Sequence, residues 1–212
     1  MRIAVVGTGM VGRTLAPAFA ALGHDVVIGT RHPGTTAARD DWTLELPLRA
    51  YPDVAEGADL VVNATNGRAS LAVLAAVGAA ALDGRVLLDV ANPLDASAGF
   101  PPTLAVKDTD SLAEQIQRAF PAARVVKSLN TVNCNVMVDP TRVGDGGTTM
   151  FVAGDDAGAR GVVVSLLQAF GWRDLIEFEE LSAARGMEMW LPLWIRLMGR
   201  LGTADFNIRV VR

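Results

Sequence analysis

Residues 1–23, with the sequence MRIAVVGTGMVGRTLAPAFAALG, decide the fold of this chain. The continuous apolar run 3–6 predicts a central parallel strand that is covered on both faces. Three glycines follow it with the spacing G-x-G-x-x-G: Gly7, Gly9 and Gly12. They permit a tight turn, the approach of a pyrophosphate to the backbone, and close packing of helix on strand. Apolar residues at helical spacing over 10–22 then predict a helix whose N-terminal amides face the phosphates.

A glycine pattern alone is weak evidence, because an ordinary strand-to-helix connection can contain the same residues. Here a second apolar run, Val26–Ile28, follows the helix and completes a strand–helix–strand unit of the expected length, about 30 residues. We therefore predict a dinucleotide-binding fold.

The residues after the second strand predict NADP(H) rather than NAD(H). An NAD site places Asp or Glu at this point to bond the ribose 2′-hydroxyl, whereas this chain has Thr30, Arg31 and His32. The guanidinium of Arg31 presents a planar fork of donors that suits a phosphate, with Thr30 and His32 beside it. Asp40 and Asp41 lie too far along the chain to replace the missing acid. The alternative is that Arg31 is a solvated surface arginine.

Apolar segments alternate with helical patterns along the rest of the chain, which predicts a doubly wound parallel α/β sheet (a Rossmann fold) in the order 3-2-1-4-5-6. The six predicted strands are 3–6, 26–29, 48–51, 60–65, 85–90 and 123–129. We expect residues 1–147 to form the NADP-binding domain and residues 148–212 a small C-terminal α/β extension. Within the chain we also expect helices over 69–82 and 181–201, and a last strand over 206–211.

Ligands of such sheets bind outside the carboxyl ends of the strands. The predicted cofactor-binding residues are Gly7, Thr8, Gly9, Met10, Val11, Gly12, Thr30, Arg31, His32, Ala64, Thr65, Asn66, Ala91, Asn92, Pro93 and Lys127. The loop after the sixth strand is predicted to contact the substrate through Asn130, Thr131, Val132, Asn133 and Cys134. Each loop residue could equally be a turn former, since Asn, Gly and Pro dominate turns.

The crevice loops carry amides and hydroxyls, which orient a carboxamide or a ribose but are neither strong acids nor strong bases near neutral pH. We therefore assign no catalytic residue. Lys127, near the end of the sixth strand, is the alternative proton donor; the competing interpretation is that its amine bonds a carbonyl or a cofactor group. Cys134 has no histidine partner in the sequence and is predicted to be a packing residue.

Composition limits the function further. The 212-residue chain has a formal charge of −4 and no basic run, which argues against nucleic acid as a partner. It has one cysteine and two histidines, so a disulfide framework and a bound metal are not expected. The start lacks the pattern of a signal peptide, and no segment is apolar over the ~20 residues that span a bilayer. We expect a cytoplasmic protein that acts on a small molecule.

The sequence resembles the family of NADPH-dependent reductases of coenzyme F420, a deazaflavin. The resemblance spans most of the chain and depends on Gly7–Gly12, Gly29–Arg31, Ala91–Leu94 and Val126–Thr131, together with a late helix that contains Arg185 and Glu188. It implies a dinucleotide-binding domain with a small C-terminal domain, usually in a homodimer, and hydride transfer between NADPH and F420. The chain departs from the family where Val132-Asn133-Cys134 replaces an Ile-Pro-Ala type of sequence. The nicotinamide-binding domains of membrane metalloreductases look similar through the same motifs.

Hydride transfer between two stacked rings requires mainly that the protein hold the rings together and exclude water. We predict an NADPH-dependent oxidoreductase that acts on a ring-shaped redox partner, with F420 as first choice. The alternatives are a flavin or ferric-chelate reductase, a small carbonyl or imine reductase, and a non-catalytic NADPH-binding sensor. The broadly apolar helix 187–198 is predicted to lie in the core or a dimer contact; the alternative is a wall over the second substrate.

Overall fold

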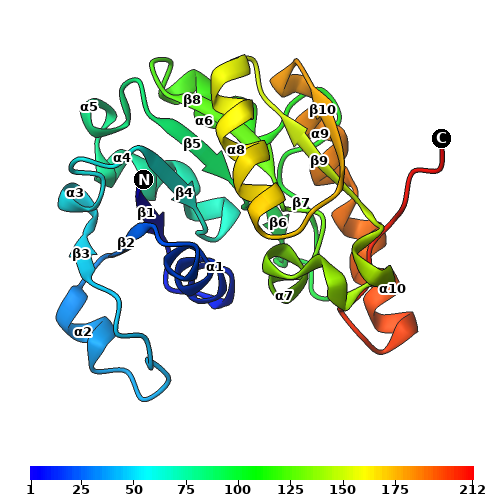
Figure 1. Ribbon diagram of the computed structural model, residues 1–212, viewed down its shortest axis with the longest axis horizontal. Helices are drawn as coiled ribbons and strands as arrows, with labels where there is room; N and C mark the ends of the chain where they lie inside the picture. The colour runs from blue at the N-terminus through cyan, green and yellow to red at the C-terminus, as the bar shows by residue number, and fades with distance from the viewer.

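The structure is a computed structural model that describes all residues, 1–212. It has three layers, with a twisted sheet between two layers of helices (Figure 1). None of the helices is both long enough and apolar enough to cross a lipid bilayer.

The sheet has eight strands in the order β10-β9-β8-β5-β4-β1-β2-β3. Their bounds are β1 Arg2–Val6, β2 Asp25–Thr30, β3 Leu48–Ala50, β4 Leu60–Asn63, β5 Val86–Asp89, β8 Arg124–Ser128, β9 Thr149–Ala153 and β10 Asp174–Phe178. A separate hairpin joins β6 Leu94–Asp95 to β7 Thr103–Leu104. The central order β3-β2-β1-β4-β5-β8 confirms the predicted order 3-2-1-4-5-6, and all of these strands run parallel.

The α-helices are α1 Met10–Ala21, α2 Pro33–Ala37, α3 Tyr51–Val54, α4 Ser70–Val77, α5 Ala79–Leu82, α6 Leu112–Ala119, α7 Cys134–Val138, α8 Ala157–Ala169, α9 Ala184–Met189 and α10 Leu191–Leu201. Short 3-10 turns precede or connect some of them: η1 Gly67–Ala69, η2 Pro140–Arg142, η3 Gly144–Gly146 and η4 Leu181–Ala183.

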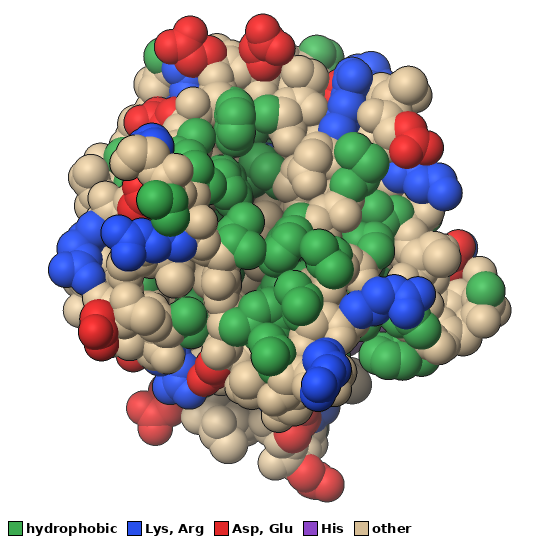
Figure 2. Space-filling model, turned by 90° about the vertical axis from the view of Figure 1, so that its right-hand side faces the viewer, with side chains coloured by type: hydrophobic (Ala, Val, Ile, Leu, Met, Phe, Trp, Pro, Cys, Tyr) green, Lys and Arg blue, Asp and Glu red, His purple; other side chains and the backbone are tan.

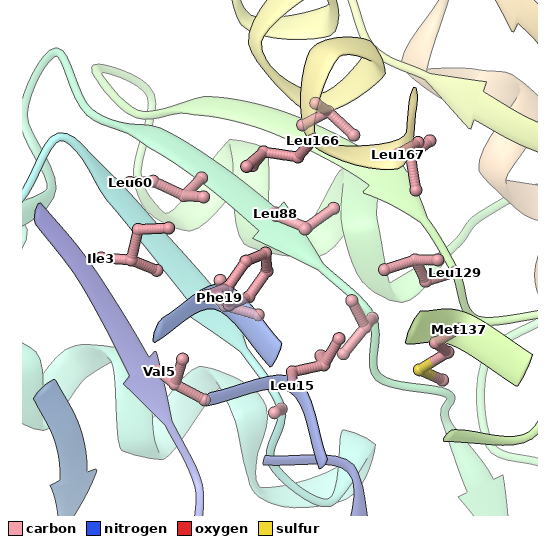
Figure 3. Close-up of a cluster of buried hydrophobic side chains, with 14 of the residues drawn as sticks. Ile3, Val5, Leu15, Phe19, Leu60, Leu88, Leu129, Met137, Leu166 and Leu167 are labelled. Atoms are coloured by element: carbon pink, nitrogen blue, oxygen red, sulfur yellow. The ribbon is translucent and has the colours of Figure 1, made fainter. Parts of the chain in front are cut away.

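Alternate residues of each strand face opposite layers, so the sheet has an apolar core on each side. Ile3 and Val5 of β1 pack with Leu15 and Phe19 of α1, and α7 and α8 cover the same face (Figure 3). Ala4 and Val6 pack on the other face, which is covered by α3, α4 and α6. The continuous apolar strands are therefore explained by burial on both sides.

The segment from residue 148 onward extends the same sheet. β9 pairs antiparallel with β8, and β10 pairs parallel with β9. Met150 of β9 and Leu166 of α8 belong to the same apolar core as Ile3 of β1. The expected boundary at 147/148 therefore marks a change in strand direction within one continuous core.

Three predicted elements differ from the structure. The helix expected over 69–82 is interrupted at Gly78, whose φ of +100° is open to glycine but rarely to other residues. The helix expected over 181–201 is divided before Pro192, which has no N–H to donate to the preceding turn. The strand expected over 206–211 does not form, because the segment makes isolated hydrogen bonds to Thr149 in place of a ladder.

Candidate functional site

The glycine turn between β1 and α1 has the shape that a bound pyrophosphate requires. A Cβ atom at Gly7 would lie 2.4 Å from the Ala64 carbonyl oxygen, and one at Gly12 would lie 2.1 Å from the Gly7 carbonyl oxygen. Neither position can therefore hold a side chain. At Gly9, by contrast, an added Cβ would meet nothing within 4 Å. No side chain caps the N-terminus of α1, so its first amides are free for an anion. The residues present therefore fit a dinucleotide phosphate above Gly9.

The three residues at the end of β2 have different environments. Arg31 and His32 are exposed, and no hydrogen bond or ion pair within the chain engages the Arg31 guanidinium. Thr30 is buried, and its hydroxyl lies 2.6 Å from the hydroxyl of Thr36 in α2. The structure thus leaves Arg31 available to a phosphate but directs Thr30 toward α2, because the β2–α2 turn uses its hydroxyl locally.

A cavity of about 500 Å³ lies outside the carboxyl ends of β4, β5 and β8. It is lined by Met10, Val11, Ala64, Thr65, Asn66, Gly67, Val90, Ala91, Asn92, Leu94, Asn130, Val132, Asn133, Cys134, Asn135, Met137, Leu191, Trp194, Met198 and Ala204. The structure therefore brings together most of the predicted crevice residues. The cavity also lies at the position where open parallel sheets bind ligands.

Two asparagines bridge the loops on either side of this cavity. Asn92 donates its amide to the Asn130 carbonyl at 2.9 Å, and Asn130 donates to the Asn92 side-chain oxygen at 2.9 Å and to the Met187 carbonyl at 3.0 Å. Because Met187 offers only an acceptor here, the nitrogen of the Asn130 amide must face it. The side-chain oxygen of Asn130 is buried without a partner. The pair therefore ties the loops after β5 and β8 to α9 and retains one free acceptor.

The sequence predicted only part of the wall that α10 forms over the cavity. Leu191, Trp194 and Met198 line it from one face of α10, and the Trp194 ring stacks on Phe206 with centroids 5.1 Å apart. One face of the helix 187–198 thus forms a wall of the cavity, and Met187 and Ile195 are buried, as predicted for a core helix. Contact of this wall with a second substrate stays a prediction. The spacing i, i+3, i+7 could have selected these three side chains as one face. Ala204 could not have been found, since it follows the helix in an irregular segment.

Two residues that were predicted to bind ligand from the loops after β5 and β8 lie outside the cavity. Pro93 does not line it. Thr131 is buried away from it, and its carbonyl accepts a hydrogen bond from the indole of Trp190 at 3.1 Å. Adjacent residues of a turn point in different directions, which explains why Asn130 faces the cavity while Thr131 does not.

Lys127 is the clearest correction. Its side chain is fully buried and does not line the cavity. The ammonium group lies 2.7 Å from Asp89, 2.9 Å from Glu188 and 2.5 Å from the Ala91 carbonyl oxygen, so all three of its protons are engaged. Neither a proton donor to substrate nor a cofactor ligand fits this geometry. The structure agrees with the competing interpretation, because the Lys127 amine donates to the Ala91 carbonyl.

The carboxylates around Lys127 extend the buried network. Asp89 also accepts from Asn63 at 2.8 Å, and Glu188 accepts from the amide of Leu112 at the start of α6 at 2.8 Å. Burial raises the pKa of Glu188 above its ordinary value, with Lys127 opposing that rise. Desolvation acts to lower the pKa of Lys127, but the two carboxylates together raise it above its ordinary value. At neutral pH the lysine is therefore charged.

Asp89 and Glu188 were missed by the sequence reasoning, although a signal existed. Asp89 and Lys127 are the charged residues near the carboxyl ends of β5 and β8, and they are register partners. Since the predicted order already made these strands neighbours, opposite charges near both ends predict a buried pair.

The cavity lining contains no Asp, Glu, His, Lys, Arg or Tyr. No group of His, Cys, Asp and Glu side chains is arranged to hold a metal ion. The site can hold and orient planar groups between amides and apolar side chains, and its lining has no carboxyl, imidazole, ammonium or phenol group to act as a general acid.

Comparisons with known proteins agree with this geometry. Residues 2–93 match the family described as NADP oxidoreductase coenzyme F420-dependent. The F420-dependent NADP reductase of Methanothermobacter thermautotrophicus is 30% identical, with 99% of this chain and 94% of that protein covered. A crystal structure from Arthrobacter sp. FB24, described as a candidate F420-dependent NADP reductase, is 54% identical over 100% of both chains, with a TM-score of 0.97.

The metalloreductase STEAP3 of Rattus norvegicus is 27% identical over 91% of this chain. The chain spans only 38% of the length of that relative.

The fold, the phosphate turn and the cavity define an NADP(H)-dependent oxidoreductase with a Rossmann domain. The chain belongs to the coenzyme F420-dependent NADP oxidoreductase family.

Proposed function

We propose that this chain transfers hydride between NADPH and coenzyme F420, with both reacting rings in the cavity below α10. The observation that carries the proposal is the lining of the cavity, which has no acidic or basic side chain. Reduction of a ketone or an imine calls for a proton donor within about 3 Å of the reacting atom. Hydride transfer between two rings requires only near-attack positioning and exclusion of water.

The cavity also supports the proposal by its size and its free polar atoms. A volume of about 500 Å³ lies in the range typical of small-molecule sites. Two lining residues have buried polar atoms without partners: the side-chain oxygen of Asn130, an acceptor, and the indole nitrogen of Trp194, a donor. A carboxamide or the pyrimidine edge of a deazaflavin offers the complementary donor and acceptor. We assign these atoms to the orientation of the bound rings.

In this proposal the glycine turn holds the pyrophosphate, and Arg31 pairs with the 2′-phosphate. NADPH supplies the hydride when it is bound. The loops with Asn66, Asn92 and Asn130 orient the ring edges, and Leu191, Trp194 and Met198 exclude water.

The test mixes the protein with NADPH and F420 and follows the absorbance of both in single turnover. We expect transfer to F420, and much slower oxidation of NADPH by small ketones and imines. Val132→Trp, which fills the cavity, should abolish transfer while the binding of 2′,5′-ADP is retained. Preferred reduction of a ketone or an imine would contradict the proposal, and binding without turnover of any acceptor would make the protein a sensor.

A flavin or ferric-chelate reductase is the second candidate. It is supported by the 27% identity to the rat metalloreductase over nearly the whole of this chain. Free flavin and a ferric chelate therefore belong in the same assay, and a higher kcat/KM for either one would select this candidate.

We also propose a homodimer in the cytoplasm. Exposed Phe178, Leu193 and Leu201 belong to β10 and α10, and apolar side chains gather on that side of the molecule (Figure 2). Burial of this face in a second copy would remove it from water. Light scattering after gel filtration gives the mass, and cell fractionation gives the compartment.

A further inference from the structure

A second group of charges lies beside the glycine turn, and the sequence motifs did not include it. Arg39 donates to both oxygens of Asp41, at 2.9 Å from Nε and 2.7 Å from Nη2. Arg13 of α1 donates to the same carboxylate and to the Asp41 carbonyl, both at 2.9 Å. We call Arg13, Arg39 and Asp41 the surface cluster.

The surface cluster points one donor at the phosphate turn. The fork to Asp41 uses Nε and Nη2 of Arg39, and its Nη1 lies 3.4 Å from the hydroxyl of Thr8. Thr8 stands between Gly7 and Gly9 in the turn. Arg39, which lies 31 positions after Thr8 in the chain, is therefore held beside the turn.

The position of Arg39 favours the ribose end of the nucleotide over the pyrophosphate. The pyrophosphate belongs above Gly9, at the N-terminus of α1. Arg39 comes soon after α2, the helix that follows β2, and the adenosine ribose of a dinucleotide lies at the end of β2. Arg31, with no partner in the chain, lies at that same end.

The charges are suited to a phosphate. The surface cluster has a net charge of +1, because Asp41 offsets one of its two arginines, and Arg31 adds a second positive charge. A phosphate monoester carries about −1.5 to −2 at neutral pH. The Asp41 carboxylate is engaged by two guanidinium groups, which reduces its repulsion of an incoming phosphate.

We propose that Arg39 is a second cationic ligand of the NADP(H) 2′-phosphate, beside Arg31, and that Asp41 is the positioning residue that holds its fork. The surface cluster thereby contributes to the preference for NADP(H) over NAD(H). This inference rests on the nucleotide site of the proposed function and is independent of the hydride acceptor.

The test is calorimetry with two nucleotide fragments that differ in the 2′-phosphate, 2′,5′-ADP and 5′-ADP. Arg39→Met should weaken the binding of 2′,5′-ADP at least about tenfold, the loss of one charge-assisted hydrogen bond, and change that of 5′-ADP less than about twofold. Asp41→Asn should weaken the binding of 2′,5′-ADP by a smaller factor than Arg39→Met does. The Arg39 and Asp41 side chains are 37% and 54% exposed, so both variants should remain folded.

Arg118→Met is the matched control, because Arg118 of α6 also makes two hydrogen bonds to one carboxylate, from Nη1 and Nη2 to Asp110. It should leave the affinity for both fragments unchanged. Equal affinity of Arg39→Met and the unaltered protein for 2′,5′-ADP would overturn the assignment of Arg39. Tighter binding by Asp41→Asn would show that the carboxylate competes with the phosphate and would overturn its holding role.

The same experiment separates this inference from the proposed function. Selective binding of 2′,5′-ADP through Arg39 by a protein that does not reduce F420 would support the inference and reject the proposed function. If the unaltered protein reduces F420 but Arg39→Met binds 2′,5′-ADP as tightly as it does, the inference is rejected and the proposed function stands. Binding of neither fragment by the unaltered protein would overturn both.

Discussion

Two clusters of three charges occur in this molecule, and they differ mainly in their access to water. The buried cluster, Asp89, Lys127 and Glu188, is 0–1% exposed. The side chains of the surface cluster are 32–54% exposed. Every proton of the Lys127 ammonium has an acceptor within the protein, whereas Arg39 retains a nitrogen directed at Thr8. The first cluster therefore has no capacity left for a ligand, and the second does.

The comparison shows why an ionisable residue close to a cavity is not by that fact a catalytic residue. In the interior, a charge is tolerated only when its partners satisfy it fully, and such a charge cannot also serve a substrate. At the surface, a charge pair contributes little to stability but can exchange one of its partners for a ligand.

The largest expected effect is on the buried cluster. Lys127→Met removes the partner of two buried carboxylates and should lower the free energy of unfolding by about 3–5 kcal/mol. Urea denaturation measures this loss. Lys107→Met, at an exposed lysine without an ion pair, is the control and should change it by less than about 0.5 kcal/mol. An unchanged unfolding free energy for Lys127→Met would contradict the difference between the clusters.

The same variant tests catalysis. If enough Lys127→Met protein is folded at low temperature, its single-turnover rate of hydride transfer at saturating substrates should stay close to that of the unaltered protein, because Lys127 does not line the cavity and no proton moves in that step. A rate lower by orders of magnitude, with intact cofactor affinity, would make Lys127 a general acid and place the protein among the carbonyl or imine reductases.

The second prediction tests whether the surface cluster lies beside a nucleotide at all. Gly9→Val should abolish NADPH binding, because the side chain would enter the open space above Gly9 that the pyrophosphate needs. The φ of −78° at Gly9 is accessible to valine, so the domain should still fold. Calorimetry and circular dichroism measure the two effects. A folded variant with unchanged affinity would place the phosphate site elsewhere.

The fold was predictable because its signals are local and repeated. Each central strand is a short apolar run, and each is followed by a helix, which fixes a parallel sheet and the site at its carboxyl edge. The start of α6 is also fixed locally, because the Ser111 hydroxyl accepts a hydrogen bond from the Glu114 amide at 3.1 Å. The C-terminal segment was harder, since its hydrogen bonds to Thr149 depend on packing and not on alternation.

The site was predictable where it follows the strand ends and unpredictable elsewhere. The cavity contains Asn66, Asn92 and Asn130 because loops after neighbouring strands meet. Arg39 and Asp41 were not found, because they lie in the irregular segment between α2 and β3, whose path no periodicity fixes. Distance along the chain had argued only against Asp41 as the acid that bonds the ribose, and it gave no sign that the fold brings Asp41 to Arg13.

The third prediction tests Arg31, the other cation at the ribose end of the nucleotide site. Arg31→Ala should weaken NADPH binding by roughly 1.5–3 kcal/mol, as expected for a charge-assisted hydrogen bond, and barely affect NADH. Calorimetry with both cofactors measures the difference. Equal losses for NADPH and NADH would show that Arg31 does not recognise the 2′-phosphate, and Arg39 would then be the main candidate for that role.

The smallest expected effect is the titration of Asp41 itself. The hydrogen bonds from Arg39 hold the pKa of the Asp41 carboxyl below its ordinary value of 3.8. Because the folded-state pKa is the lower one, the stabilisation from this pair is present above pH 3.8 and is lost as the pH falls through the folded-state pKa. Carboxyl carbon NMR should give a midpoint below 3.8, and Arg39→Met should move it upward. Addition of 2′,5′-ADP provides a further test: if Arg39 turns part of its fork from Asp41 to the phosphate, the midpoint should also rise, since the carboxylate then has a weaker donor and an anion nearby. A midpoint that does not respond to the nucleotide, in a protein that binds it, would mean that the surface cluster is as closed to ligands as the buried one.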